Sequence, residues 1–99
     1  MRLSNTYQTI IKEKFLQIFG NKSNIYLFGS RVDDTKKGGD IDLYIITDKK
    51  LSSEIRFEKK IKFISQLQLS LGEQKFDVII SKDPTRLIEQ EAIKNGIKL

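Results

Sequence analysis

Two aspartates open a stretch of sequence that otherwise has the pattern of a buried strand. Asp40 and Asp42 begin the run Asp-Ile-Asp-Leu-Tyr-Ile-Ile-Thr, and because side chains alternate along a strand, both carboxylates project from one face. Carboxylates this close raise each other's pKa unless a cation lies between them. A divalent cation removes the repulsion, and a pair of cations supports in-line phosphoryl displacement. A solvated strand end is the alternative, and these two residues alone do not decide between them.

A third aspartate strengthens the interpretation of a metal site. Asp77 lies in Phe-Asp-Val-Ile-Ile, residues 76–80, where an acid is costly unless its face of the strand is open or holds a metal. If this strand lies beside the one that begins at Asp40, all three carboxylates converge on the side of the sheet that carries no helix. An edge strand with one polar side is the alternative.

Gly29 and Ser30 follow an apolar run and precede Arg31. Backbone N–H groups and a hydroxyl at such a strand end can hold phosphate oxygens, and a glycine allows the close approach that this requires. The spacings of a Walker A loop and of a dinucleotide-binding loop are absent. An ordinary turn is the alternative for Gly29-Ser30, and a solvated surface arginine is the alternative for Arg31.

The composition limits the catalytic groups and metal ligands that the protein can use. The 99 residues contain no cysteine and no histidine, which excludes thiolate and imidazole catalysis and leaves oxygen ligands for a hard cation such as Mg²⁺, Ca²⁺ or Mn²⁺. The net charge of +5 fits either a polyanionic partner or simple solubility. No aromatic platform, nucleic-acid module, signal peptide or membrane-length apolar run is recognisable. We therefore expect a cytoplasmic protein that binds no membrane and forms no stable complex with nucleic acid.

Apolar periodicity predicts the elements that must position these groups. Apolar residues recur at three- and four-residue spacing in two predicted helices, 4–19 and 52–71. A third helix is predicted to run to about Asn95, with Asp83 as its N-cap and Pro84 in its first turn.

Three predicted strands, 24–28, 40–47 and 75–81, complete the set. The short connection between strands 24–28 and 40–47 lets them pair antiparallel, which brings Ser30 beside the aspartates. The long helix 52–71 allows strand 75–81 to pair in parallel with strand 40–47. The order α-β-loop-β-α-β-α predicts an α/β fold of the α+β type. We expect one domain, residues 1–99, with a small mixed three-stranded sheet and helices packed mainly on one face.

The motif as a whole resembles a known signature. Gly29-Ser30, nine further residues, Asp40-Ile41-Asp42 and a distal Asp77 resemble the DNA polymerase beta-type nucleotidyltransferase superfamily. The most similar branch is the minimal nucleotidyltransferase (MNT), the antitoxin half of HEPN/MNT toxin–antitoxin pairs. Matching runs are Phe28 to Arg31, Gly39 to Leu43, and the tail from Ile88 to Leu99. The resemblance covers essentially the whole chain and implies the nucleotidyltransferase fold.

The resemblance also implies an activity, the Mg²⁺-dependent transfer of AMP from ATP to a tyrosine hydroxyl of a HEPN-domain toxin, with release of pyrophosphate. Asp40 and Asp42 would bridge two Mg²⁺ ions, with Mn²⁺ as a substitute, and Asp77 would complete the ion at the attacking hydroxyl. Ser30 and the backbone of Gly29 would hold the phosphates, with Arg31 adding charge. A small-molecule nucleotidyltransferase of the aminoglycoside-modifying type and a binding-only antitoxin that masks its partner are the alternatives.

Overall fold

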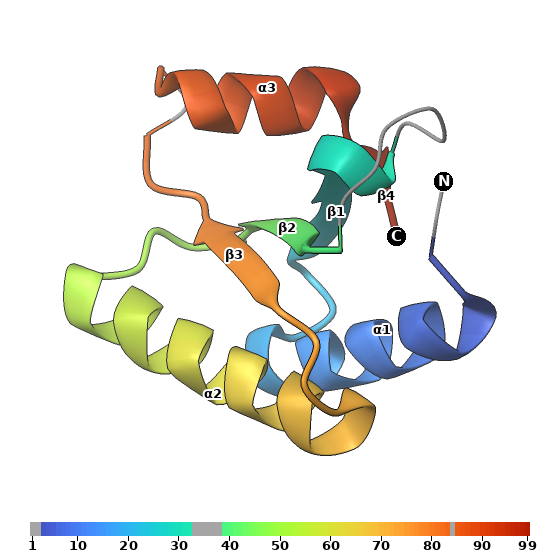
Figure 1. The fold of residues 1–99 in the computed structure, drawn as a ribbon. Coiled ribbons are helices and arrows are strands. Elements are labelled where there is room, and N and C mark those ends of the chain that lie inside the picture. Colours follow the sequence, from blue (N-terminus) through green and yellow to red (C-terminus); the bar gives the residue numbers. More distant parts are fainter. Residues whose placement is uncertain (1–2, 33–38, 84) are drawn as a thin grey trace.

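The computed structural model describes residues 3–32, 39–83 and 85–99. Its elements, in chain order, are α1 (Asn5–Phe19), β1 (Asn24–Phe28), the 3₁₀ turn η1 (Gly29–Arg31), β2 (Ile41–Ile46), α2 (Ser53–Leu71), β3 (Phe76–Ile80), α3 (Leu87–Asn95) and β4 (Ile97–Lys98) (Figure 1). Residues 33–38, in the loop predicted between the strands at 24–28 and 40–47, lie outside the described residues, as does Pro84.

The sheet is mixed, with the strand order β3-β2-β1-β4. β1 pairs antiparallel with β2, and β2 pairs in parallel with β3, as the sequence predicts. The prediction of three strands is wrong by one, because β4 adds antiparallel to the outer side of β1. Gly96 allows this return, since a Cβ there would overlap the carbonyl oxygen of Ala92. The two residues of β4 are too few to show an alternating pattern.

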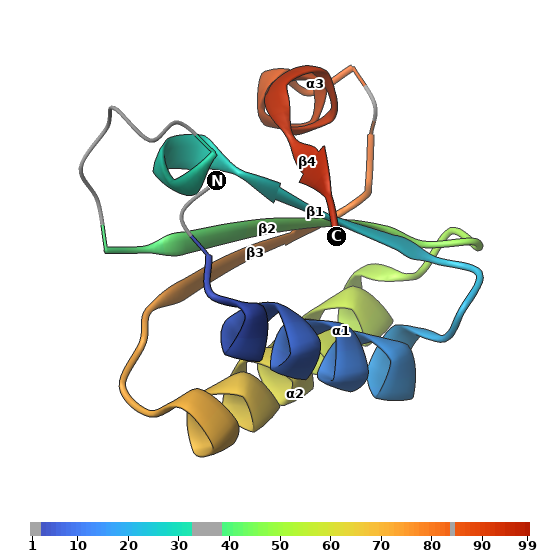
Figure 2. The ribbon, with the colours of Figure 1, turned by 90° about the vertical axis from the view of Figure 1, so that its right-hand side faces the viewer.

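Two layers of helix enclose the sheet. α1 and α2 cover one face, and α3 crosses the other (Figure 2). Alternate residues of the three long strands are buried against α1 and α2: Ile25, Leu27, Ile41, Leu43, Ile45, Phe76, Val78 and Ile80. The intervening positions face α3, where Phe28, Tyr44 and Ala92 form a smaller cluster. The face expected to carry no helix is therefore partly covered, so a site there is bounded by α3.

Side-chain caps set the starts of the first two helices. The hydroxyls of Ser4 and Ser52 accept the N–H groups of Tyr7 and Ile55, both at 3.2 Å, so each helix begins one residue later than predicted. Lys59 of α2 donates to the carbonyl oxygen of Ile18 at 2.8 Å. This bond ties α2 to the last turn of α1, so Lys59 has a structural role.

The start of α3 differs from the prediction. Arg86, and not Asp83, is its N-cap residue. The carboxylate of Asp83 instead accepts both the N–H (2.9 Å) and the hydroxyl (2.7 Å) of Thr85, which lowers the pKa of Asp83. Its own N–H donates to Glu89 at 2.9 Å. These bonds favour a turn ahead of α3 over a further helical turn.

Candidate functional site

The strand register brings two of the three aspartates together. Asp42 in β2 lies opposite Phe28, the last residue of β1, and opposite Asp77 in β3. Asp42 and Asp77 therefore occupy neighbouring positions on the face of the sheet that carries α3. The predicted convergence of these two carboxylates is confirmed.

Asp42 is partly buried beside two other acidic side chains, which makes its charged form less favourable. Burial raises the pKa of its carboxyl above the ordinary value of 3.8, and the charge of Asp77, a hydrogen bond with Asp77 and the charge of Asp40 raise it further. Lys75 acts in the opposite direction. A carboxylate in this position is most readily kept ionised by a cation bound beside it and Asp77.

Asp40 has a different environment from the other two aspartates. It directly precedes β2, and its Oδ2 lies 3.4 Å from Nζ of Lys75, with both side chains well exposed. Its charge raises the pKa of Lys75. No group of three acidic side chains is assembled as a metal site within residues 3–32, 39–83 and 85–99. Because an exposed ion pair contributes little to stability, Asp40 can exchange Lys75 for another cation at small cost.

Gly29 brings a turn of backbone against Asp42. Its φ of +76° lies in the region that favours glycine. A Cβ built there would overlap Oδ2 of Asp42 and lie 3.0 Å from its Cγ. Any side chain at this position would therefore displace the Asp42 carboxylate. The side chain of Ser30 lies outside the described part, although its backbone belongs to η1.

Arg31 connects the two ends of the loop. Its Nη2 donates to the carbonyl oxygen of Gly39 at 2.8 Å, and Nε2 of Gln74 donates to the same oxygen at 2.5 Å. These bonds join η1 to the segment that leads into Asp40. Arg31 thus helps to hold the predicted phosphate-binding turn beside the aspartates, whether or not it contacts phosphate.

Asp42 and Asp77 open into a shared cavity of about 340 Å³. Phe28, Phe76 and Ile88 form its apolar walls, and Lys60 of α2 lies at its border. Ile88 belongs to α3, so the position of that helix shapes the cavity. Since Asp77 is exposed, a reacting group from outside the chain can reach it.

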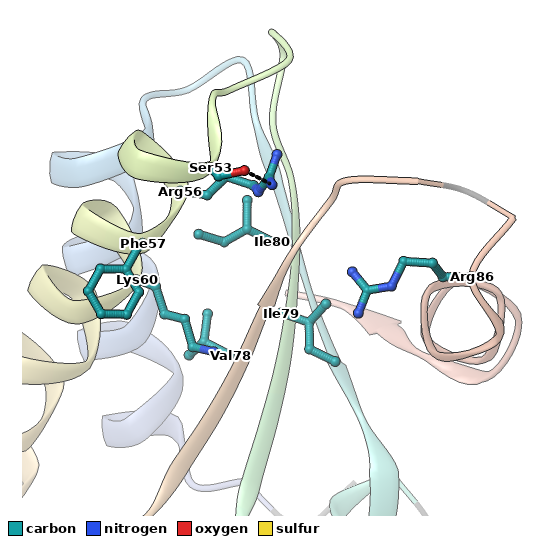
Figure 3. A pocket seen from close by; sticks show the side chains of 8 residues that line it. All are labelled: Ser53, Arg56, Phe57, Lys60, Val78, Ile79, Ile80 and Arg86. Atoms are coloured by element: carbon teal, nitrogen blue, oxygen red, sulfur yellow. Dashed lines mark hydrogen bonds between the residues drawn. The ribbon is translucent and has the colours of Figure 1, made fainter.

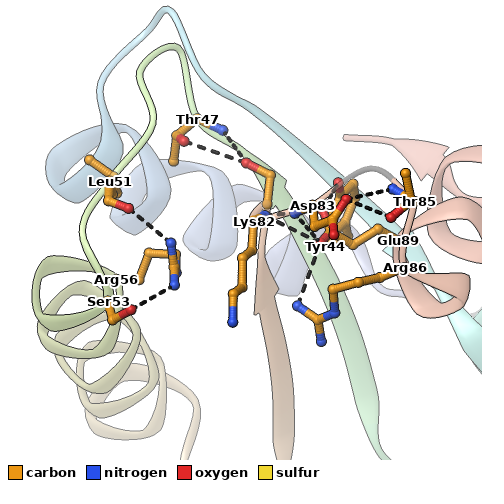
Figure 4. Close-up of polar contacts among 11 residues, drawn as sticks. Tyr44, Thr47, Leu51, Ser53, Arg56, Lys82, Asp83, Thr85, Arg86 and Glu89 are labelled. Atoms are coloured by element: carbon orange, nitrogen blue, oxygen red, sulfur yellow. Dashed lines mark hydrogen bonds and ion pairs between the residues drawn. The ribbon is translucent and has the colours of Figure 1, made fainter.

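Glu89 fixes α3 in place, although the sequence pattern does not single it out. Glu89 is only 1% exposed, yet its carboxylate accepts four donors (Figure 4). Tyr44 Oη donates at 2.7 Å, the N–H groups of Lys82 and Asp83 at 3.2 and 2.9 Å, and Arg86 forms an ion pair at 3.5 Å. Burial raises the pKa of Tyr44, and so do its hydrogen bond to Glu89 and the charge of Glu89.

Glu89 is a positioning residue, because it ties α3 to β2 and to the segment after β3. An acid on an amphipathic helix is ordinarily solvated. The one indication that Glu89 is buried is its three-residue spacing from the small apolar Ala92, which is fully buried. That spacing places Glu89 on the face of α3 that packs against the sheet.

Comparison with solved structures identifies several proteins with a similar fold. A protein from Shewanella oneidensis superimposes with a TM-score of 0.69 at 14% identity, covering 98% of this chain and 71% of that one. A toxin–antitoxin complex with AMP-PNP gives 0.61 at 24% identity, covering 89% and 68%. A tri-AMPylated Shewanella oneidensis HEPN toxin in complex with an MNT antitoxin gives 0.57 at 21%, covering 92% and 70%.

The helices of the described residues are too short or too polar to cross a membrane.

A comparison with family models shows which family the chain belongs to, whereas a search of curated proteins gave no significant match. The family model described as polymerase beta, nucleotidyltransferase, matches residues 10–99. That match spans α3, the sheet and the cavity with Asp42 and Asp77, and the chain belongs to the polymerase beta-type nucleotidyltransferase family.

Proposed function

We propose that this chain transfers AMP from ATP to a tyrosine hydroxyl of a HEPN-domain toxin and thereby acts as the antitoxin of the pair. Family membership supports nucleotidyl transfer. Among its structural relatives, one complex contains AMP-PNP and another a tri-AMPylated HEPN toxin. The observation that carries the proposal is the position of Asp42, between the Gly29 turn and Asp77. We assign the reaction to the cytoplasm.

The nucleotide occupies the side of the site nearest β1. The backbone N–H groups of Gly29 and Ser30, with the Ser30 hydroxyl, bind the terminal phosphates. Gly29 allows phosphate oxygens to approach because it has no side chain. Arg31, tied to Gly39 at 2.8 Å, holds this turn and adds positive charge beside the phosphates.

The carboxylates fit two divalent cations, Mg²⁺ or its substitute Mn²⁺. The raised pKa of Asp42 and the oxygen-only donor set of the site agree with a hard cation. Asp42 and Asp77 are already neighbours, and Asp40 joins them by releasing Lys75. When bound, such ions neutralise charge on the entering and leaving oxygens.

The transfer follows from this arrangement. The acceptor hydroxyl approaches Asp77, whose carboxylate takes its proton. The hydroxyl oxygen forms a bond to the α-phosphorus as the bond from that phosphorus to the bridging oxygen breaks, and pyrophosphate leaves. The turn at Gly29 keeps the triphosphate in line for this displacement.

Mass spectrometry tests the proposal directly. The chain is incubated with ATP, Mg²⁺ and the protein encoded by the neighbouring gene, and the masses of both intact proteins are measured. We expect the partner to gain one or more adenylyl groups with wild type and none with Asp77→Asn, although the variant still binds. If wild type adds no mass and Asp77→Asn still neutralises the partner fully in cells, masking explains the function. Transfer to an aminoglycoside with none to protein would point to the small-molecule class.

A further inference from the structure

A second hollow crosses the outer edge of the sheet next to the aspartates. β3 is the end strand on this side, and a cavity of about 240 Å³ lies along it (Figure 3). α2 contributes Arg56, Phe57 and Lys60 from one side, and Arg86 reaches it from the other side of the strand. Lys60 also borders the cavity that contains Asp42 and Asp77, so the two hollows adjoin.

The hollow continues away from the aspartates. A further cavity shares Ser53 and Arg56 with it and is lined in addition by Lys50, Lys82 and Asp83. We call the two together the β3-edge groove, defined by Lys50, Ser53, Arg56, Phe57, Lys60, Lys82, Asp83 and Arg86. It leads from the end of β3 to the border of the Asp42–Asp77 cavity.

The groove is basic. Its lining includes five cationic side chains, on Lys50, Arg56, Lys60, Lys82 and Arg86. The charge of Arg86 is offset by its ion pair with Glu89, so the excess of positive charge comes from the other four. Asp83 is the one acid among the described lining residues, and it is occupied by two hydrogen bonds from Thr85. Such a concentration of positive charge attracts acidic groups and repels basic ones.

One side chain of the groove is large, apolar and open. Phe57 lines the first of the two cavities, on the α2 side, and is 65% exposed. It projects beside Lys60 from the same helix (Figure 3). An exposed aromatic ring flanked by cations is suited to a polypeptide that carries both apolar and acidic side chains.

The position of the groove indicates what it binds. The Gly29 turn lies on the β1 side of Asp42, whereas Asp77 and the groove lie on the β3 side. A nucleotide held at the turn leaves only the β3 side for an acceptor that must reach Asp77. This arrangement favours the groove as the approach for the acceptor over a second site for the phosphates.

We propose that the β3-edge groove binds an acidic segment of the partner protein and presents the adjoining acceptor hydroxyl to Asp77. This inference rests on the proposed function and names the surface that recognises the acceptor. Lys60, at the junction of the two hollows, pairs with an acidic side chain of the segment. Phe57 packs against an apolar one.

A charge reversal with a matched control tests the electrostatic part. Lys60 and Lys62 are both exposed on α2, but Lys62 lines neither the groove nor the Asp42–Asp77 cavity. We expect Lys60→Glu to raise the Kd for the partner protein about tenfold or more, and Lys62→Glu to raise it less than about twofold. Equal effects of the two reversals on partner binding overturn the proposal.

Cross-linking identifies the occupant. A photoreactive p-benzoylphenylalanine replaces Phe57 in one variant and Leu69 in another, because Leu69 is 81% exposed on the same helix and lines no part of the groove. We expect a cross-link from position 57 to an acidic partner peptide that neighbours the modified tyrosine, and none from position 69. A cross-link to a basic segment, to a segment remote from the acceptor, or equally from both positions overturns the proposal.

The outcomes separate the two proposals. If wild type modifies the partner but Lys60→Glu behaves like Lys62→Glu, the transfer stands and the groove is not its docking surface. If position 57 captures the acidic segment but wild type adds no adenylyl group, the docking surface stands and the transfer does not.

Discussion

Two carboxylates on the same side of the sheet have opposite surroundings. Glu89 is buried, and the polar groups that bind its carboxylate are all donors: a phenol, two backbone N–H groups and a guanidinium. Asp42 is half-buried, and Asp77 and Asp40 both raise its pKa. Donors therefore balance the charge of Glu89, whereas the other two aspartates disfavour the charge of Asp42.

This difference separates a structural acid from a reactive one. A buried charge surrounded by donors is part of the fold, and its removal leaves those donors without partners. A charge placed against like charges reduces stability unless something binds there. In a nucleotidyltransferase, we expect the second kind to hold the cations and the first kind to hold the walls of the site.

The largest expected effect is on transfer. Asp42→Asn should lower the rate of adenylyl transfer on the order of 1,000-fold, because it removes a central charge of the reacting site. Without Mg²⁺ the variant should be as stable as wild type or more stable, because repulsion with Asp77 is relieved. Rates are measured by labelled AMP incorporation, and stability by thermal unfolding in EDTA. Normal turnover by Asp42→Asn would remove this residue from the mechanism.

Glu89→Gln should have the opposite profile. We expect the free energy of unfolding to fall by about 2 kcal/mol, because an amide cannot accept all the donors that face the carboxylate. Urea denaturation measures the loss. The folded fraction should transfer AMP at a rate close to that of wild type, since Glu89 contacts neither Asp42 nor Asp77 in the described structure. Unchanged stability with lost transfer would assign Glu89 to the chemistry instead.

Gly29 and Gly20 provide a matched pair for the phosphate-binding turn. Both have positive φ, +76° and +84°, but a Cβ at Gly20 meets nothing within 4 Å. Alanine at either position should reduce stability by about 1 kcal/mol through backbone strain. Only Gly29→Ala should also weaken ATP binding, by about tenfold, because its Cβ overlaps the Asp42 carboxylate. Calorimetric titration of the two variants with ATP makes the comparison, and equal ATP affinities would refute the role of the turn.

Tyr44→Phe should have the smallest effect, with a distinctive pH dependence. Loss of the hydrogen bond to Glu89 should reduce stability by about 1 kcal/mol at neutral pH. The pKa of Tyr44 is raised above 10.0 in the fold, so its contribution is complete below pH 10 and is lost as the pH rises through the raised value. Alkaline unfolding curves of the two proteins should therefore converge above pH 10. A constant difference would mean that Tyr44 does not titrate with unfolding.

The sequence predicts the reactive acids better than the structural one, for a physical reason. Asp42 and Asp77 interrupt apolar strands, where a charge is unexpected, and strand alternation fixes the face that they share. Glu89 lies on a helix, where an acid is ordinary, and its partners come from segments far away in sequence. The same bonds explain why the predicted start of α3 is wrong: Glu89 accepts the N–H groups of the segment before the helix and holds it as a turn.

Other details depend on tertiary contacts that a single segment does not show. β4 forms because Gly96 lets the chain approach Ala92 and return beside β1, not because two residues favour a strand. Asp40 has the predicted spacing, but its pairing with Lys75 depends on the parallel alignment of β2 with β3.

Localising a paramagnetic cation tests the central contrast most directly. Mn²⁺ is titrated into the chain with AMP-PNP present, and the broadening of backbone amide signals is followed by NMR. We predict that the signals of Gly29, Asp42 and Asp77 broaden at lower Mn²⁺ concentrations than those of Glu89 and Tyr44, and that Asp42→Asn abolishes this order. Broadening centred on Glu89, or the same pattern in Asp42→Asn, would contradict the assignment of Asp42 and Asp77 as the open cation site.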